Sequence, residues 1–204
     1  MSENEGKEEK INILTLGNTA VGKTTYIIKY TENTFQQVHL ITTGLDFKTK
    51  KITLPNNKDY LLFLYDTAGE EKYKSISLNL IKNADGILLF YDITDKSSFN
   101  SISGWIENIY NQKDQHFPLI LLGNKCDLEE ERKVSKEEGE KLANQFGIKF
   151  YEISNKDGIN IEEPCTELID KIIEYQQTTK NTNKFNIKIK KNIDRGNNSA
   201  SCPC

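Results

Sequence analysis

A glycine-rich stretch joins the first apolar run of the chain to the first segment with helical spacing. Its sequence, GNTAVGKT at 17–24, fits the pattern G-x-x-x-x-G-K-[ST]. Glycines let main-chain N–H groups curl around phosphate oxygens, and the N-terminus of the following helix adds partial positive charge. In this pattern Lys23 reaches the β- and γ-phosphates and the Thr24 hydroxyl binds Mg²⁺. The stretch predicts a nucleotide site, with a plain strand-to-helix turn as the alternative.

Apolar runs alternate with helical segments along the chain. Near-continuous apolar strands between helices are typical of a mostly parallel sheet covered on both faces. Residues 47–54 and 60–64 flank PNNKD, a link too short for a crossover, and predict an antiparallel hairpin. The expected fold class is α/β, with a six-stranded, mostly parallel sheet, one antiparallel strand and about five helices. The other expected strands are 11–16, 87–91, 119–122 and 149–153, and the expected helices are 23–31, 97–111, 135–146 and 161–175.

Charge divides the chain into a body and a tail. The 204 residues carry a formal net charge of −3, but from Gln176 onward six basic residues face one acid, which gives the tail +5 and the rest −8. An acidic body argues against nucleic-acid binding, and a basic tail favours an anionic membrane surface. We expect a flexible N-terminus at 1–9, one globular domain at 10–176 and a flexible basic tail at 177–204. A short docked strand at FNIKIKK is the alternative for part of the tail.

The four cysteines do not form a disulfide framework. Cys126 and Cys165 lie in periodic, core-like segments, and Cys202 and Cys204 are crowded at the C-terminal end, which favours a reducing compartment. No apolar run approaches the ~18 residues of a membrane span, and the N-terminus has no signal-peptide pattern. We expect a cytosolic protein unless a lipid is attached.

A second polar motif, NKCD at 124–127, follows the apolar run 119–122. In a doubly wound sheet, residues at the C-terminal ends of strands point into the ligand crevice. The carboxylate of Asp127 can accept hydrogen bonds from N1–H and the exocyclic amine of guanine. Adenine lacks that pair and would leave the carboxylate unsatisfied, at a cost of ~1–3 kcal/mol or more. Downstream of a phosphate loop the motif predicts guanine recognition, with an ordinary polar loop as the alternative.

Together these motifs resemble those of the Ras superfamily of small GTPases, and within it the Rab family. The resemblance covers residues 10–175 and the last three residues. DTAG at 66–69 is similar to the family's γ-phosphate sensor, and SNK at 154–156 to the loop that closes over the guanine. TTGLDFK at 42–48, LLFYDIT at 88–94 and the terminal CPC favour Rab over Ras, Rho and Ran.

The resemblance implies GTP or GDP with Mg²⁺ as ligands. It implies Mg²⁺ at Thr24, Thr42 and Asp66, the γ-phosphate at the Gly69 N–H, and the Phe35 ring against the base. The residues implied in catalysis are Lys23, Thr42, Gly69 and Glu70. The implied nucleotide-binding set is Gly17, Asn18, Thr19, Ala20, Val21, Gly22, Lys23, Thr24, Thr25, Phe35, Thr42, Asp66, Gly69, Asn124, Lys125, Asp127, Ser154, Asn155 and Lys156.

Glu70 departs from the family, which usually has a glutamine there to orient the attacking water. A glutamine amide accepts from water and donates to a phosphate oxygen, whereas an ionised glutamate only accepts. Its charge opposes the γ-phosphate by about 1 kcal/mol at ~4 Å in bulk water and about 4 kcal/mol at an effective dielectric constant of 20. We expect the side chain to turn away, hydrolysis to be slow and the GTP state to be long-lived. A general-base role for Glu70 is the alternative.

Other departures lie outside the reacting groups. Tyr65 stands where Rabs usually have Trp, and LIK at 80–82 where they commonly have Tyr-Tyr-Arg. Phe47, Tyr65 and Leu80 therefore predict an unusual set of effectors. Asn155 replaces a usual alanine, and we expect little loss of binding because its N–H still faces guanine O6.

The resemblance also implies the partners and location of a Rab. The partners are an exchange factor, an activating protein that supplies arginine and glutamine, a GDP-dissociation inhibitor or escort protein, and effectors. The C-x-C end implies geranylgeranylation of Cys202 and Cys204, and two lipid chains supply the two signals of stable anchoring. A small metal or redox cysteine pair is the alternative. The expected location is the cytoplasmic face of an endomembrane, with a cytosolic pool.

The expected function is a GTP-dependent switch in vesicle traffic. The alternatives are a GTP-locked, membrane-anchored scaffold and a P-loop kinase, although a kinase would have no use for NKCD. A nucleic-acid role rests on the basic tail alone, and we expect no nucleic-acid partner.

Overall fold

The computed structural model describes residues 9–35, 45–54, 57–67 and 74–197, and its strands form one sheet. Within these ranges the sheet has six strands in the order β2-β3-β1-β4-β5-β6. β2 and β3 are antiparallel, and every other neighbouring pair is parallel. The α/β prediction and the hairpin are confirmed. The strands are β1 (Glu9–Gly17), β2 (Leu45–Thr53), β3 (Asp59–Thr67), β4 (Gly86–Asp92), β5 (Leu119–Asn124) and β6 (Lys149–Ile153).

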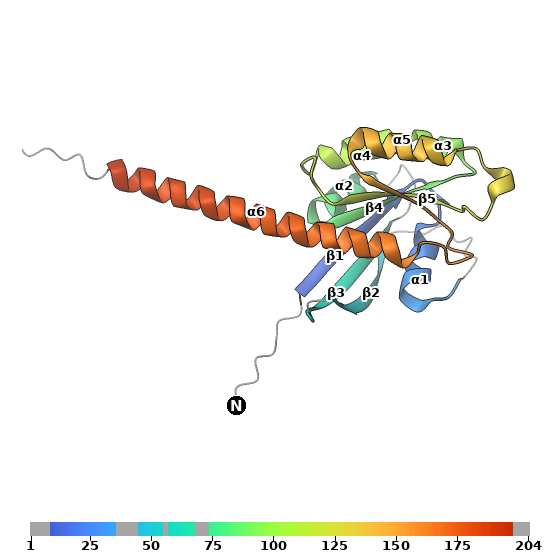
Figure 1. The fold of residues 1–204 in the computed structure, drawn as a ribbon, viewed down its shortest axis with the longest axis horizontal. Helices are drawn as coiled ribbons and strands as arrows, with labels where there is room; N and C mark the ends of the chain where they lie inside the picture. Colours follow the sequence, from blue (N-terminus) through green and yellow to red (C-terminus); the bar gives the residue numbers. More distant parts are fainter. Residues whose placement is uncertain (1–8, 36–44, 55–56, 68–73, 198–204) are drawn as a thin grey trace, which may run out of the picture.

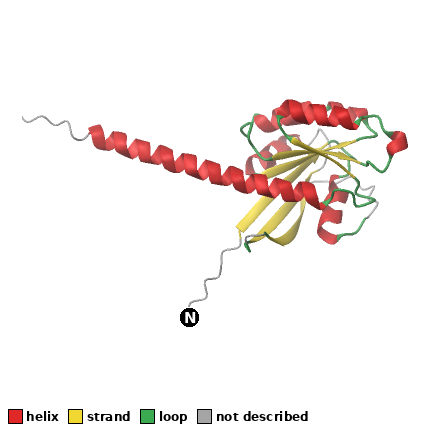
Figure 2. Cartoon of the chain, in the orientation of Figure 1, coloured by secondary structure: helices red, strands yellow, loops and turns green. Residues whose placement is uncertain are grey.

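Helices cover both faces of the sheet (Figures 1 and 2). α1 (Lys23–Glu32) and α6 (Glu162–Asn197) pack on one face. The other face carries α2 (Lys74–Asn83), α3 (Lys96–Asn100), α4 (Ile102–Tyr110) and α5 (Lys136–Phe146). β1 shows why the strands read as continuous apolar runs, because its residues alternate between the two cores. Ile11 and Ile13 belong to the first cluster, and Leu14 and Leu16 to the second.

A local sequence signal explains where α5 begins. SKEE at 135–138 forms the capping box: the Ser135 hydroxyl accepts from the Glu138 N–H (3.2 Å), and the Glu138 carboxylate accepts from the Ser135 N–H (3.0 Å). The helix expected over 97–111 is interrupted at Ser101, which separates α3 from α4. With those two counted as one, the described helices match the expected number. α2 was not among the helices that the sequence analysis gave by residue range.

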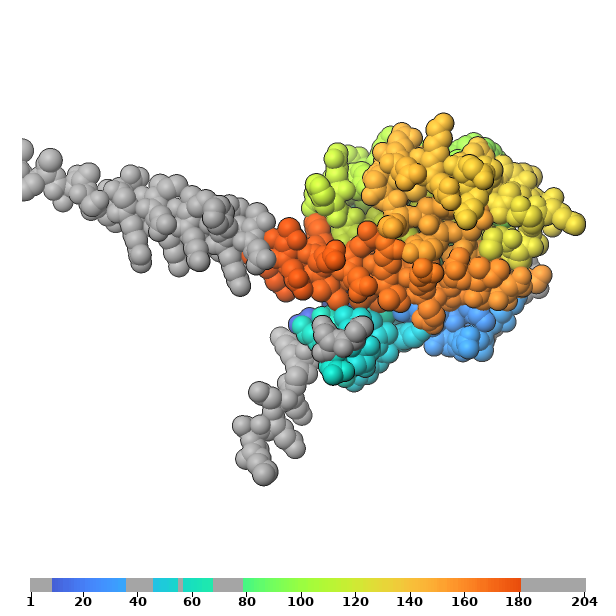
Figure 3. Space-filling view, viewed as in Figure 1, coloured from blue at the N-terminus to red at the C-terminus, as the bar shows by residue number. Residues whose placement is uncertain are grey.

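α6 differs most from the expectation. Its first part packs on the body through buried Cys165, Leu168 and Ile172, and Figure 3 shows this part lying along the body. The helix then continues past Tyr175 to Asn197 and leaves the body (Figure 1). The structure thus has a helix over 177–197, where the sequence suggested a flexible tail or a short docked strand. A physical reason is that 176–195 contain neither glycine nor proline, the strongest helix breakers.

No helix among the described residues combines the length and the apolar character that a bilayer crossing requires.

Candidate nucleotide-binding site

Two positions of the turn from β1 to α1 have a backbone conformation that favours glycine. Gly17 has φ 135° and Gly22 has φ 98°. A Cβ on Gly17 would lie 2.3 Å from the carbonyl oxygen of Phe90 on β4, so the loop sits directly against the sheet. Gly22 is the N-cap of α1, and no side chain among the described residues caps the helix there. The helix N-terminus is therefore open to an anion.

Lys23 is buried at the start of α1. Its side chain is 5% exposed, and its Nζ donates to the carbonyl oxygens of Gly17 (3.0 Å) and Asn18 (2.8 Å). Burial lowers the pKa of the Lys23 ammonium to about 8, against the opposing effect of Asp66. A bound phosphate would favour the charged form, so this position suits an anionic ligand.

Two oxygen-bearing side chains meet beside Lys23. The Thr24 hydroxyl in the first turn of α1 donates to Oδ2 of Asp66 near the end of β3, at 2.5 Å. Asp66 is 5% exposed. Hydroxyl and carboxylate oxygens are hard ligands of the kind that Mg²⁺ prefers, so the pair fits the predicted metal site. The third predicted ligand, Thr42, lies outside the described residues.

The phosphate loop is also fastened to α4. The indole N–H of Trp105 donates to Oδ1 of Asn18 (3.1 Å), and Nδ2 of Asn18 donates to the Ser101 hydroxyl (3.1 Å). The sequence analysis named Asn18 but neither partner. Trp105 is the only tryptophan of the chain. That single tryptophan was the available signal, since the N–H of a buried indole usually has a hydrogen-bond partner.

The two guanine motifs lie next to each other and against the phosphate loop. Asn124, at the end of β5, is 2% exposed and donates from Nδ2 to the Val21 carbonyl at 2.8 Å. Oδ1 of Asp127 accepts from the Ser154 hydroxyl at 2.6 Å. Nζ of Lys156 lies 3.9 Å from the other carboxylate oxygen of Asp127. The structure thus brings together motifs that are far apart in the sequence.

Lys125 has a partner that the sequence analysis missed. Its Nζ lies 2.6 Å from Oδ2 of Asp92, whose side chain is 8% exposed at the end of β4. Oδ1 of the same carboxylate accepts from the N–H of Thr94 at 2.8 Å. The carboxylate therefore holds the Lys125 side chain against β4. Asp92 ends an apolar strand, which was the signal that could have identified it.

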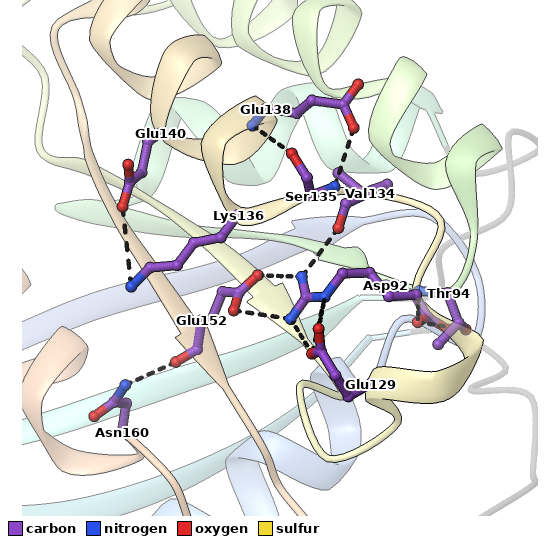
Figure 4. Close-up of polar contacts among 11 residues, drawn as sticks. Asp92, Thr94, Glu129, Val134, Ser135, Lys136, Glu138, Glu140, Glu152 and Asn160 are labelled. Carbon is purple, nitrogen blue, oxygen red and sulfur yellow. Dashed lines mark hydrogen bonds and ion pairs between the residues drawn. The ribbon is translucent and has the colours of Figure 1, made fainter.

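Arg132 joins the segment after NKCD to β6. It donates to Oε1 of Glu152 on β6 (2.5 Å), to the Val134 carbonyl (3.0 Å) and to Oε2 of Glu129 (2.7 Å). Figure 4 shows these three acceptors converging on one guanidinium. Because β6 leads directly into Ser154, Arg132 holds the supports of the two guanine motifs together.

The remaining predicted site residues fall into two groups. Val21 is buried and Thr25 half-buried, Thr19 and Ala20 are exposed on the phosphate loop, and Phe35 is 41% exposed after α1. The predicted residues that lie outside the described ranges are Thr42, Gly69, Glu70, Cys202 and Cys204.

Known proteins are similar in sequence to this chain over most of its length. The sequence model of the Ras family matches residues 12–174. Ras-related protein Rab-3A of Homo sapiens is 38% identical over 181 residues, which are 89% of this chain and 82% of that protein. Ras-related protein Rab-8 of Diplobatis ommata is 38% identical over 173 residues, 85% of this chain and 82% of that protein. Ras-related protein Rab-3C of Mus musculus is 36% identical over 169 residues, 83% of this chain and 74% of that protein.

The similarity to these proteins is consistent with the observed fold and with a nucleotide site where the phosphate loop contacts the guanine motifs. GTP and GDP with Mg²⁺ are the ligands of such proteins, and GTP hydrolysis is their reaction. The chain belongs to the Ras superfamily, and within it the chain is a small GTPase of the Rab family.

Proposed function

We propose that this Rab-family GTPase is a membrane-traffic switch whose GTP state is long-lived because Glu70 replaces the usual glutamine. One observation carries the switch: Nδ2 of Asn124 donates to the Val21 carbonyl at 2.8 Å, which joins the guanine motif to the phosphate loop. A guanine nucleotide would bind across this junction, and the family resemblance implies that Thr42 and Gly69 contact its γ-phosphate. Loops that contact the γ-phosphate present different surfaces in the two nucleotide states.

The described residues divide the work of nucleotide binding. Lys23 exchanges the carbonyl oxygens of Gly17 and Asn18 for phosphate oxygens, which places a positive charge at the β- and γ-phosphates. Thr24 and Asp66 would hold Mg²⁺, which would offset phosphate charge at this place. Asp127, aligned by the Ser154 hydroxyl, accepts from the guanine edge. These residues bind and position the nucleotide and form no covalent bond to it.

Slow hydrolysis follows from the chemistry of Glu70. A carboxylate cannot donate to a phosphate oxygen, and its charge repels the γ-phosphate. The attacking water therefore lacks the residue that orients it in relatives with glutamine. A general-base role would need the carboxylate to approach the γ-phosphate against this repulsion.

A single-turnover measurement tests this proposal. Protein loaded with GTP is mixed with Mg²⁺, and phosphate release is followed for wild type, Glu70→Gln and Glu71→Gln. We expect Glu70→Gln to accelerate release and Glu71→Gln, which removes the adjacent charge, to leave it unchanged. No acceleration in Glu70→Gln would reject the proposal, and a slower Glu70→Gln would favour the general base.

A GTP-locked scaffold is the second candidate, favoured by the same substitution. The two functions differ in turnover with an activating protein, which can supply the missing glutamine and an arginine in trans. Multiple-turnover hydrolysis with Rab-activating catalytic domains separates them. Acceleration supports a switch that cycles, and its absence with every domain tested supports the scaffold.

An aromatic surface on the β2–β3 hairpin is the proposed effector site. The Phe47 side chain is 52% exposed, and its ring lies 5.9 Å from the rings of both Phe63 and Tyr65. Leu80 on α2 and Tyr65 both pack at the edge of the second core. Exposed aromatic rings are enriched in protein interfaces. Phe47→Ala should weaken capture of GTP-dependent partners and leave nucleotide affinity unchanged.

Membrane attachment is proposed through lipids on Cys202 and Cys204. α6 supports this role because it carries the chain away from the body as far as Asn197. The basic residues that follow Gln176 would add a salt-sensitive attraction to an anionic leaflet. A Cys202→Ser/Cys204→Ser variant should move from the membrane fraction of cells to the cytosol. Retention in membranes would exclude the lipid anchor.

A further inference from the structure

Asn155 lies in the guanine loop directly after β6, and its side chain reaches the phosphate loop. The residue is 4% exposed, and its Nδ2 donates to the carbonyl oxygen of Gly22 at 2.9 Å. Gly22 is the N-cap of α1. The bond therefore connects the loop that faces the base to the position where the phosphate-binding helix begins. The alanine that relatives usually carry at Asn155 has no side-chain donor for this contact.

A second amide makes a parallel contact next to it. Nδ2 of Asn124 donates to the carbonyl of Val21, the residue before Gly22. A Cβ on Gly22 would lie 2.2 Å from Nδ2 of Asn124 and 3.0 Å from Nδ2 of Asn155. Both amides thus pack directly over the glycine. The Asn155 bond adds to the Asn124 bond rather than replacing it.

The rest of the Asn155 amide is also buried. Its Oδ1 has no hydrogen-bond partner among the described residues. Burying an unsatisfied acceptor is unfavourable. The hydrogen bond from Nδ2 to the Gly22 carbonyl and the packing of the side chain must offset this cost. Such a contact depends on the Gly22 carbonyl staying where it is. It would break when the phosphate loop and the guanine loop separate.

We propose that the Asn155 side chain is a second strap between the two loops and slows nucleotide release. This inference rests on the proposed binding of a guanine nucleotide across the loops. The nucleotide contacts both loops at once, so any separation of the loops weakens nucleotide binding. A strap that keeps the loops in register preorganises the site, and such changes in affinity appear mainly in the dissociation rate. Asn155 is thus a positioning residue.

The dissociation rate of labelled GDP in the presence of Mg²⁺ tests the strap. Asn155→Ala should release GDP about threefold to tenfold faster than wild type, as expected for the loss of one hydrogen bond. Asn155→Leu, which fills a similar volume without a donor, should also release faster. Slow release in Asn155→Leu with fast release in Asn155→Ala would assign the effect to packing and overturn the strap.

Asn83→Ala is the matched control. Asn83 on α2 also donates from its side-chain amide to a carbonyl, that of Asn79, at 3.3 Å. This variant should release GDP at the wild-type rate. If the wild-type chain retains no guanine nucleotide, the proposed function fails. If it retains GDP and both Asn155 variants release it at the wild-type rate, the strap alone is rejected.

Discussion

The nucleotide site has a phosphate end, formed by residues 17–24, and a base end, formed by residues 124–127 and 154–156. The two ends are built differently. At the phosphate end the backbone dominates: Gly17 and Gly22 take positive φ, and Lys23 bonds main-chain carbonyls. At the base end buried side chains dominate, with the Ser154 hydroxyl bonded to Asp127. Phosphates are common to all nucleotides, whereas the base differs. The contrast therefore suggests that the backbone supplies affinity and the side chains supply selectivity.

The largest effect should come from the phosphate end. Lys23→Met should lower the affinity for GTP and GDP by about 1000-fold, because hydrogen bonds of a charged group contribute ~1.5–3 kcal/mol each. The loss should not depend on the base. Calorimetric titration with GTP and with ATP measures it. Lys29→Met, on the same helix, is the control and should bind as wild type, and an equal loss in both variants would contradict a specific role for Lys23.

The next effect should come from the base end and should depend on the base. Asp127→Asn retains one acceptor and loses the carboxylate charge, so GTP affinity should fall by about 10- to 100-fold. The weak affinity for ATP should stay the same, because adenine lacks the donor pair. Competition binding with both nucleotides gives the ratio. Asp157→Asn makes the same change at an exposed position nearby and should leave the ratio as in wild type.

A smaller effect is expected from the support beneath the base end. Arg132→Met leaves the half-buried carboxylate of Glu152 without its bidentate partner. The free energy of unfolding should fall by about 2 kcal/mol. Urea denaturation of the nucleotide-free protein measures the change. Glu152→Gln in the Arg132→Met background should recover much of the loss, and simple additivity of the two changes would show that the pair is not coupled.

The two ends also differ in how well the sequence predicted them. The phosphate loop could be predicted because its pattern, GNTAVGKT, reflects the local backbone that glycine permits. NKCD and SNK were found as separate motifs, and they meet in the structure because the strands that precede them, β5 and β6, are parallel neighbours. The contact of Asn155 with Gly22 could not be predicted, since the two residues are 133 positions apart and the contact depends on the direction in which one side chain points. The expectation that Asn155 matters little considered only its backbone N–H.

A similar lesson holds for α6 and the sheet. The buried strands β4 and β5 are apolar over most of their length and were predicted close to their observed bounds. α6 extends to Asn197, past the end at 175 that helical spacing predicted, through a segment of polar composition. Composition reports whether a segment can bury surface, and it does not by itself decide whether an exposed segment is helical.

The smallest expected effect returns to the phosphate end, at the hydrogen bond that Trp105 of α4 makes to it. Trp105→Phe keeps most of the apolar ring but removes the N–H that donates to Asn18 at 3.1 Å. Loss of one neutral hydrogen bond should accelerate GDP release about twofold to tenfold, with no change in the preference for guanine over adenine. Asn18→Ala removes the acceptor of this bond and also the bond to Ser101, so it should release GDP at least as fast, and the double variant should be no faster than Asn18→Ala. A change in base preference would show instead that the two ends of the site are coupled through α4.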